Sequence, residues 1–431
     1  WSWACRQGHI QTLNHLLNTL LLYFLVRSRI NEVRDLSAEA LKYIPDNPDT
    51  VLFHRKMQVL SALIQFDRNP SNIAPEWLKS LMDYFRELPN SPDLGAIFVL
   101  LQSLSHYPMG DTIRGEYWIK RAQAIFDATG DTFGKIMALR GLGWVVHERI
   151  QYTESKRIFQ QAYDLSRLHH DTWNEGENIR SLAEVAYTLG EYPLAEQMTY
   201  EGIILSEKVG DRGGLANGMS FLATILFRLG KYDDCEMVNE RCIAMLRDLG
   251  NVNGLAWQHL IWAELHRVRG QVEQANAIFA QTLNEHTALN NKRGMAWALI
   301  GWAWHQFLLD AWDEAELLIN RASDCFEHDA HRQWGMVMVD NIRAEIACSR
   351  GDFITARKLI DNAIDEAEKC QSIMFQTRNW MTLARILADG GDKRTALTWL
   401  EKAIAHHATW ADLRDRALQL RNQWLVALAR A

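Results

Sequence analysis

The sequence predicts an all-α solenoid of stacked helical hairpins. Three small residues recur every 40 positions, with one step of 41, through eight consecutive units. Within each unit they stand 12 and then 7 positions apart, as expected where two antiparallel helices and the next hairpin approach too closely for a large side chain. Glycines at helix ends and a scarcity of proline in this region support the same period. In chain order the triplets are Ser103/Gly115/Ala122, Gly143/Ser155/Ala162, Ala183/Ala195/Gly202, Ala223/Cys235/Cys242, Ala263/Ala275/Thr282, Ala303/Ala315/Ala322, Ala344/Ala356/Ala363 and Ala384/Ala396/Ala403.

The N-terminal part, residues 1–93, is predicted to form irregular helical hairpins that continue the solenoid. Helical segments are expected at His9–Val26, Ile30–Ile44, Val51–Phe66 and Pro75–Leu88. Six of the eight prolines lie in this part, where they mark helix starts and links rather than helix interiors.

Turn residues set the order of elements in the regular part. Gly190, Gly230 and Gly270 are expected to end the first helix of a hairpin, because glycine accepts positive φ without a steric penalty. Asp211 and Asn251 follow a second glycine and are expected to cap the next helix, as is Asp131. Each unit therefore reads as helix A, a tight turn, helix B and a short capped link. The eight units cover residues 94–414, and 415–431 is expected to be a C-terminal capping helix that covers the last hairpin.

The offsets of the small residues resemble those of the tetratricopeptide repeat (TPR), which places small side chains at equivalent points of helices A and B. The resemblance implies a right-handed superhelical solenoid. It is not complete, because the usual unit is about 34 residues long whereas this one is 40, and the closing proline is missing. We therefore expect a superhelical pitch that differs from the usual one.

Composition limits the partners and the compartment. The formal net charge of −7 argues against binding of nucleic acid, which calls for a basic face. The six cysteines form no C-x-x-C pair and fit reduced thiols in the cytoplasm. The apolar run Leu20–Val26 is too short to cross a bilayer, and we expect it to be the buried face of a helix rather than a membrane segment. Because the chain starts at Trp1, inside a predicted helix, we expect it to be a piece of a longer protein.

No motif for catalysis, metal binding or cofactor binding is evident. The phosphate loop Gly-x-x-x-x-Gly-Lys-Ser/Thr, the Gly-x-Ser-x-Gly elbow and His-Glu-x-x-His are absent. We therefore predict a binding module with no catalytic residue, metal or cofactor in this region.

Helix A carries the candidate partner-binding residues. If the small residue of helix A faces the packing seam, the positions six before, one after and four after it face the concave surface of the solenoid. Trp and Met are frequent there, where a solvated face would carry Lys and Glu, and exposed aromatic clusters with a charged rim are typical of recognition surfaces. The alternative is that tryptophans such as Trp257, Trp297 and Trp304 only fill the core between stacked helices. The predicted binding residues are Trp144, Tyr187, Phe227, Trp257, Arg267, Trp297, Trp304, Phe307, Arg378 and Arg385.

The style of the repeats resembles a second, narrower family. Residues 209–216, Val-Gly-Asp-Arg-Gly-Gly-Leu-Ala, followed by 229–233, Leu-Gly-Lys-Tyr-Asp, and the segment 21–32 look like the C-terminal TPR sensor of bacterial STAND NTPases and of large LuxR-type and AfsR-like regulators. The resemblance implies a sensor that binds a protein, a peptide or a small inducer and controls an attached signalling NTPase. Two alternatives stay open, a free-standing scaffold or adaptor and the regulatory region of an enzyme such as a caspase-like protease whose catalytic domain lies elsewhere.

Overall fold

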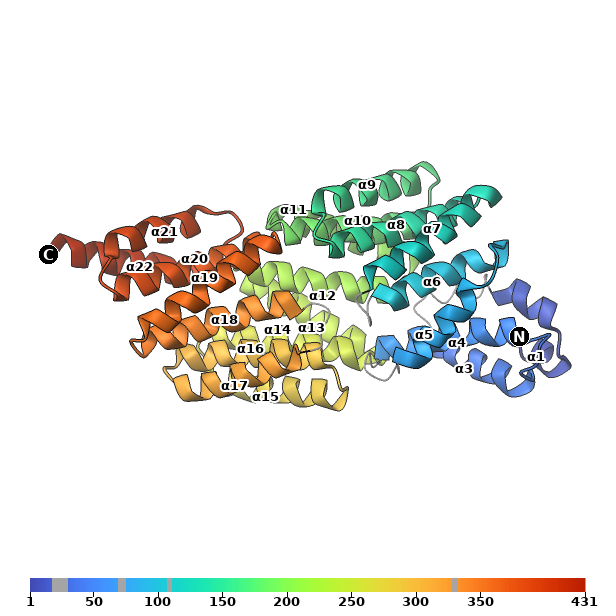
Figure 1. Cartoon of the computed structure of the whole chain (residues 1–431), viewed down its shortest axis with the longest axis horizontal. Helices are drawn as coiled ribbons and strands as arrows, with labels where there is room; N and C mark the ends of the chain where they lie inside the picture. The colour runs from blue at the N-terminus through green and yellow to red at the C-terminus, as the bar shows by residue number, and fades with distance from the viewer. Residues whose placement is uncertain (18–29, 69–74, 107–110, 328–331, 431) are drawn as a thin grey trace. The chain divides into compact units, whose positions relative to one another are not determined.

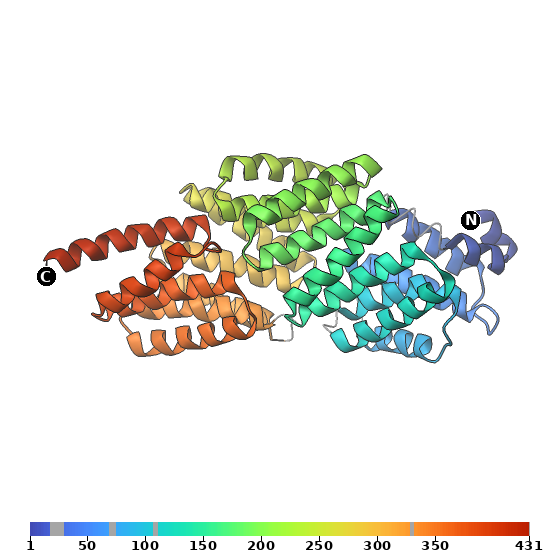
Figure 2. The same ribbon diagram turned by 90° about the horizontal axis from the view of Figure 1, so that it is seen from above.

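The computed structural model describes residues 1–17, 30–68, 75–106, 111–327 and 332–430. These ranges consist of helices joined by short turns and links, and no β-strand occurs in them. Successive helices lie side by side as antiparallel pairs (Figure 1), and the same pairing is visible in the perpendicular view of Figure 2. The predicted all-α hairpin solenoid is confirmed.

The helices near the start of the chain are spaced less regularly than those that follow. In addition to the helices given next, residues 10–17 are helical. The helices with their bounds are α1 Ser2–Gln7, α3 Ile30–Tyr43, α4 Val51–Arg68, α5 Pro75–Arg86, η2 Pro92–Leu94 (a short 3-10 helix), α6 Gly95–His106, α7 Thr112–Thr129, α8 Thr132–Glu148, α9 Tyr152–Leu168, α10 Thr172–Thr188, α11 Tyr192–Val209, α12 Arg212–Leu229, α13 Tyr232–Leu249, α14 Val252–Val268, α15 Val272–Ala288, α16 Lys292–Leu308, α17 Trp312–Cys325, α18 Arg332–Ser349, α19 Phe353–Lys369, α20 Ile373–Asp389, α21 Lys393–Ala405 and α22 Ala411–Arg430.

The 40-residue period divides into two halves of equal length. From α7 to α21 a new helix begins every 20 residues, with one step of 21, so that each repeat holds one helix A and one helix B. Even-numbered helices from α6 to α20 are helix A and carry the first small residue of each triplet. Helix A packs on its own helix B and also on the next helix A, as α16 does on α17 and α18.

Left-handed residues end the helices at the predicted places. Gly190, Gly230 and Gly270 have φ of 76°, 76° and 72°. Before and after these three turns, non-glycine residues take the same role at helix ends, including Ile150 with φ 62° and Asn290 with φ 49°. A β-branched residue with positive φ is strained, so Ile150 shows that the 20-residue period is kept even where the sequence does not favour the turn.

The predicted caps are confirmed as well. The side chain of Asp131 accepts a hydrogen bond from the backbone N–H of Gly134 at 3.0 Å. Asp211 and Asn251 accept from the N–H groups of Gly214 and Gly254, both at 2.8 Å. Each acceptor satisfies one of the backbone donors that a helix start leaves without a partner.

The small residues of the triplets lie where the spacing predicts. All of them are buried except Ser103, which is half-buried. At Gly143 a Cβ atom would lie 2.5 Å from the ring of Phe159 on the paired helix, which leaves no room for a side chain. The period therefore records the close approach of neighbouring helices.

The chain divides into two compact units, which the sequence did not reveal. Unit 1 comprises residues 1–182 and 198–218, and unit 2 comprises 183–197 and 219–431. The sequence holds no proline-rich linker that would mark such a boundary. The division instead runs through the helices α10, α11 and α12 and needs no linker.

The N-terminal segments of unit 1 follow the prediction closely. Helices α3, α4 and α5 begin at the expected residues Ile30, Val51 and Pro75. The apolar run Leu20–Val26 lies outside the described residues. In the described part of the chain, no helix is long and apolar enough to cross a membrane.

Helix α22 begins four residues before the predicted boundary at 415 and packs on α21 and α20. One face of it is apolar. Leu413, Ala417 and Trp424 are buried in the same hydrophobic cluster as residues of α20 and α21. This face covers the last hairpin, as a capping helix would.

Candidate functional site

Aromatic and arginine side chains of unit 2 gather where helix A of four hairpins meets α22. We call this set the arginine–aromatic site. It comprises Arg267 of α14, Trp304 and Phe307 of α16, Glu345 of α18, and Arg378 and Arg385 of α20. Five of these six were among the predicted binding residues, and Glu345 occupies the equivalent position of its own helix A. The facing residues of α22 are Asp412 and Arg416.

Trp304 forms the centre of the site. Its side chain is only 5% exposed and stacks on Phe307, with ring centroids 5.2 Å apart and planes at 20°. The guanidinium carbons of Arg378 and Arg416 lie 4.1 and 4.9 Å from the centroid of the indole ring. A cation this close to an aromatic face is attracted by its quadrupole, so the ring favours two cations here.

Glu345 is a buried carboxylate held by cations. It is 3% exposed and forms an ion pair with Arg385, a hydrogen bond from the hydroxyl of Thr382 at 2.8 Å and a longer ion pair with Arg416 at 3.6 Å. Burial acts to raise the pKa of Glu345, but Arg416 and Arg385 outweigh it and keep the pKa below its ordinary value. The group is therefore ionised at neutral pH.

Arg267 joins α14 to α22. Its Nε donates to Glu264 at 2.6 Å, and its Nη2 donates to Asp412 at 2.8 Å. The Arg267 side chain is 7% exposed and that of Asp412 is 14% exposed. Burial acts to raise the pKa of Asp412, but the charge of Arg267 outweighs it, so the pKa lies below its ordinary value and Asp412 is a carboxylate.

Arg378 is the least satisfied charge of the site. Its side chain is nearly fully buried, and its Nε donates to the amide oxygen of Asn341 at 2.8 Å. Its buried Nη2 has no hydrogen-bond partner among the described residues. Burial lowers the pKa of Arg378 to about 10, which still leaves a cation at neutral pH. A buried cation with an unused donor is costly, so it calls for an explanation beyond packing.

A second contact to the start of α22 involves residues far away in the sequence. The indole N–H of Trp410 donates to the hydroxyl of Tyr192 at 3.2 Å, and this hydroxyl donates to the backbone oxygen of Ala408 at 3.3 Å. The guanidinium carbon of Arg228 lies 3.6 Å from the centroid of the Trp410 ring. The Nε of Arg228 donates to the hydroxyl of Tyr187 at 3.3 Å, which brings this predicted residue to the same place.

The remaining predicted residues do not join the site. Trp257 packs edge-on against His286 of α15, and Trp297 packs edge-on against Phe326, which follows α17. Both therefore contact the helix B side of their own hairpin. Trp144 belongs to unit 1 and contacts Phe159 of its own hairpin.

Phe227 is also buried, and its ring contacts the ring of Tyr232 and the guanidinium of Arg228 rather than Trp304. It lies beside the contact of Arg228 with Trp410, next to the arginine–aromatic site.

Sequence reasoning did not single out the partners that α22 supplies. Trp410, Asp412 and Arg416 were assigned only to the end of the repeats and to a cap, and Arg228 was passed over in favour of Phe227. A signal was available, because Asp412 and Arg416 are four positions apart and so share a face of α22 that differs from the apolar one. Charged residues on a second face of a capping helix indicate a second contact.

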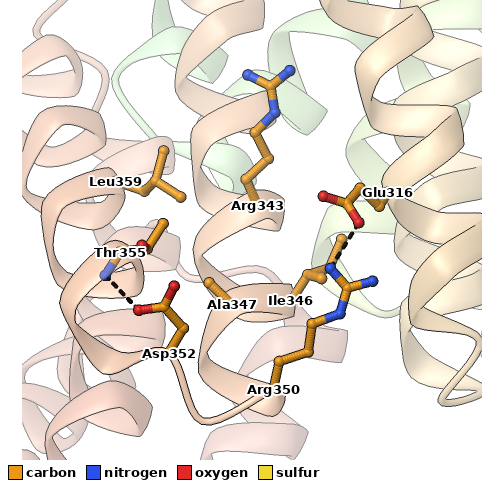
Figure 3. A pocket seen from close by; sticks show the side chains of 8 residues that line it. All are labelled: Glu316, Arg343, Ile346, Ala347, Arg350, Asp352, Thr355 and Leu359. Carbon is orange, nitrogen blue, oxygen red and sulfur yellow. Dashed lines mark hydrogen bonds and ion pairs between the residues drawn. The ribbon is translucent and has the colours of Figure 1, made fainter.

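A separate pocket of about 280 Å³ lies among α17, α18 and α19, lined by Glu316, Arg343, Ile346, Ala347, Arg350, Asp352, Thr355 and Leu359 (Figure 3). Its charged groups are already used. Arg350 forms ion pairs with Glu316 at 2.7 Å and Asp313 at 2.5 Å, and Asp352 caps the start of α19. The ion pairs and the cap therefore occupy most of the charged groups of this pocket.

Comparisons with known proteins support the fold. No protein-family model and no curated protein matches the sequence. Among solved structures, a Rap protein complexed with Competence and Sporulation Factor matches with a TM-score of 0.63 and 11% identity, over 84% of this chain and 99% of the other. The Rap conjugation gene regulator of plasmid pLS20, in complex with the Phr* peptide, matches with a TM-score of 0.53 and 12% identity, over 85% and 97%.

A human IFIT1 dimer with m7Gppp-AAAA matches with a TM-score of 0.50 and 14% identity, over 93% of this chain and 86% of the other. At these identities the likeness establishes a TPR-like solenoid and leaves the ligand to be argued from the site itself.

Proposed function

We propose that this chain is a cytoplasmic regulatory module that binds a peptide or a protein segment through the arginine–aromatic site of unit 2. The observation that carries the proposal is Arg378, a buried cation whose Nη2 has no acceptor among the described residues. A buried charged group with a donor that has no acceptor costs stability. A residue that costs stability is expected where a ligand makes use of it.

The chemistry of the site favours a peptide or a protein over other ligands. Stacked aromatic side chains and desolvated arginines are the groups that carry most of the binding energy in protein interfaces. The Rap structures solved with Competence and Sporulation Factor and with a Phr* peptide have the same fold, which is consistent with a peptide ligand. A small inducer would use the same donors, and the net charge of −7 disfavours nucleic acid.

We further propose that the module is the sensor of an attached STAND-type signalling NTPase, with α22 as its C-terminal cap. The resemblance of the repeats to such sensors supports this context. The sequence of the full-length gene tests this context, and we expect a Walker A motif upstream of Trp1. A His/Cys protease segment there would instead support the regulatory region of an enzyme. A gene that begins near Trp1 would support a free-standing adaptor.

Binding is tested by partner retention. The tagged full-length protein is purified from its own host under conditions that activate it, and the bound molecules are identified by mass spectrometry. We expect the variant Arg378→Met to lose the main partner and the control Arg343→Met, in the pocket of Figure 3, to keep it.

Equal retention by both variants would contradict the proposed site. Loss of a bound RNA rather than a peptide or protein would contradict the proposed ligand class.

A further inference from the structure

The segment Trp410–Arg416 contacts the repeats as a bound peptide would. Trp410 supplies an aromatic ring to Arg228 and an indole N–H to Tyr192, and Asp412 supplies a carboxylate to Arg267. The contacted residues of the repeats lie between 145 and 218 positions earlier in the chain. The contacts therefore come from the folding back of the C-terminal segment onto distant hairpins and not from local packing.

Capping of the last hairpin does not require these contacts. The capping face of α22 consists of Leu413, Ala417 and Trp424, which are buried against α20 and α21. Asp412 and Arg416 lie on a different face and meet side chains of α14, α16 and α18. Helix α22 thus has two separate sets of contacts, an apolar face that packs on the last hairpin and a charged face that meets earlier hairpins.

The charge of the repeats at this place favours an acidic ligand. The hairpins contribute four guanidinium groups, those of Arg228, Arg267, Arg378 and Arg385. The acidic side chains paired with these arginines are Glu264, Glu345 and the half-exposed Asp389. One positive charge is therefore in excess before α22 is counted, and it stays in excess afterwards because the carboxylate of Asp412 is balanced by the guanidinium of Arg416.

The fit of the internal segment is incomplete. Arg416 lies close to the same indole ring as Arg378, so two like charges are held at one ring. Arg378 receives no acceptor from the segment, because its Nη2 has no partner among the described residues. A ligand with an oxygen acceptor at this point would make one hydrogen bond more than the internal segment and so could replace it.

We propose that the arginine–aromatic site, together with Arg228 beside it, binds an acidic peptide with an aromatic residue two positions before a carboxylate, and that Trp410–Arg416 occupies both until such a peptide displaces it. This proposal rests on the proposed function and specifies the class of peptide that the site binds. The aromatic ring of the ligand takes the place of Trp410 over Arg228. Its carboxylate takes the place of Asp412 at Arg267.

The test uses a fluorescently labelled peptide of residues 407–418, His-Ala-Thr-Trp-Ala-Asp-Leu-Arg-Asp-Arg-Ala-Leu, and the full chain. Asp412→Asn in the chain weakens the internal contact while Arg267 keeps its ion pair with Glu264. Loss of one partner of a buried charge pair changes affinity by at least about tenfold. We therefore expect the peptide to bind the Asp412→Asn chain at least about tenfold more tightly than the unmodified chain.

The matched control is Asp415→Asn, an exposed carboxylate on the same helix, which should leave the affinity for the peptide unchanged. A peptide that itself carries Asp412→Asn should bind at least about tenfold more weakly than the native one. Equal affinity of the peptide for all three chains would overturn the proposal.

Hydrogen exchange of the unmodified chain gives a second readout that does not depend on the folding of a variant. Saturating peptide should accelerate exchange in residues 411–420, and binding of the peptide without this change would overturn the displacement. Dimerisation of the Asp412→Asn chain without peptide binding would assign the site to a second copy and overturn the ligand class. If no peptide binds but Arg378→Met still loses the copurified partner, this inference fails and the proposed function stands.

Discussion

The two ends of α16 place their tryptophans in different surroundings, beside the paired helix at the start and in the arginine–aromatic site at the end. Trp297, near the start, is half-buried and contacts Phe326 on the helix B side of its own hairpin. Trp304, two turns later, contacts Phe307 and two arginines that come from α20 and α22. Both positions were predicted to face one surface. The position of an aromatic residue along helix A therefore decides which helices it contacts.

The largest expected effect concerns Trp297. Loss of a large core side chain costs about 3–5 kcal/mol; because Trp297 is half-buried, we expect Trp297→Ala to lower the free energy of unfolding by about 3 kcal/mol, measured by urea denaturation. Affinity of the folded fraction for the partner should stay unchanged. Trp304→Ala should lower both the free energy of unfolding and the affinity for the partner, since Trp304 is buried and belongs to the arginine–aromatic site. If Trp297→Ala lost affinity for the partner and Trp304→Ala did not, the contrast between the two tryptophans would be wrong.

A smaller effect concerns pH. The pKa values of Glu345 and Asp412 are lowered in the folded chain, so the stability that they contribute is present above their ordinary pKa values and is lost as pH falls through the folded values. We expect the stability that the contact of α22 with Arg267 contributes to decline as the pH falls below the ordinary pKa of an aspartate, about 3.9. Thermal unfolding between pH 7 and pH 3 should show a difference between the unmodified chain and Asp412→Asn that shrinks as the pH falls. A constant difference would contradict the pairing.

The smallest effect concerns the start of α16. Asn291 caps this helix by accepting from the N–H of Gly294 at 3.0 Å, and loss of a cap costs about 1 kcal/mol. Asn291→Ala should lower the unfolding midpoint slightly and leave partner binding intact. Weakened binding with an unchanged midpoint would extend the site to the start of the helix.

The fold was predictable because its causes are local and repeated. Small residues such as Ala303 and Ala315 recur wherever helices touch, and the caps at Asp131 and Asn251 act within four residues of themselves. A period of this kind can be read from one sequence. The boundary between the two units could not, since it runs through α10, α11 and α12 without a change in composition.

The site was predictable only on the side of the repeats. Arg267, Trp304, Phe307, Arg378 and Arg385 follow from the period of helix A. The charged second face of α22 indicates a further contact, but no local pattern specifies which residues of earlier hairpins that face meets. For the same reason Trp257 and Trp297 could not be separated from Trp304.

The most direct test of the account is the stability of Arg378→Met. If Arg378 is present for a ligand, removal of a buried cation with an unused donor should leave the thermal unfolding midpoint of the free chain unchanged or raise it, while partner binding is lost. A midpoint that falls by several degrees, with binding by the remaining folded chain unaffected, would assign Arg378 to the core and contradict the central claim.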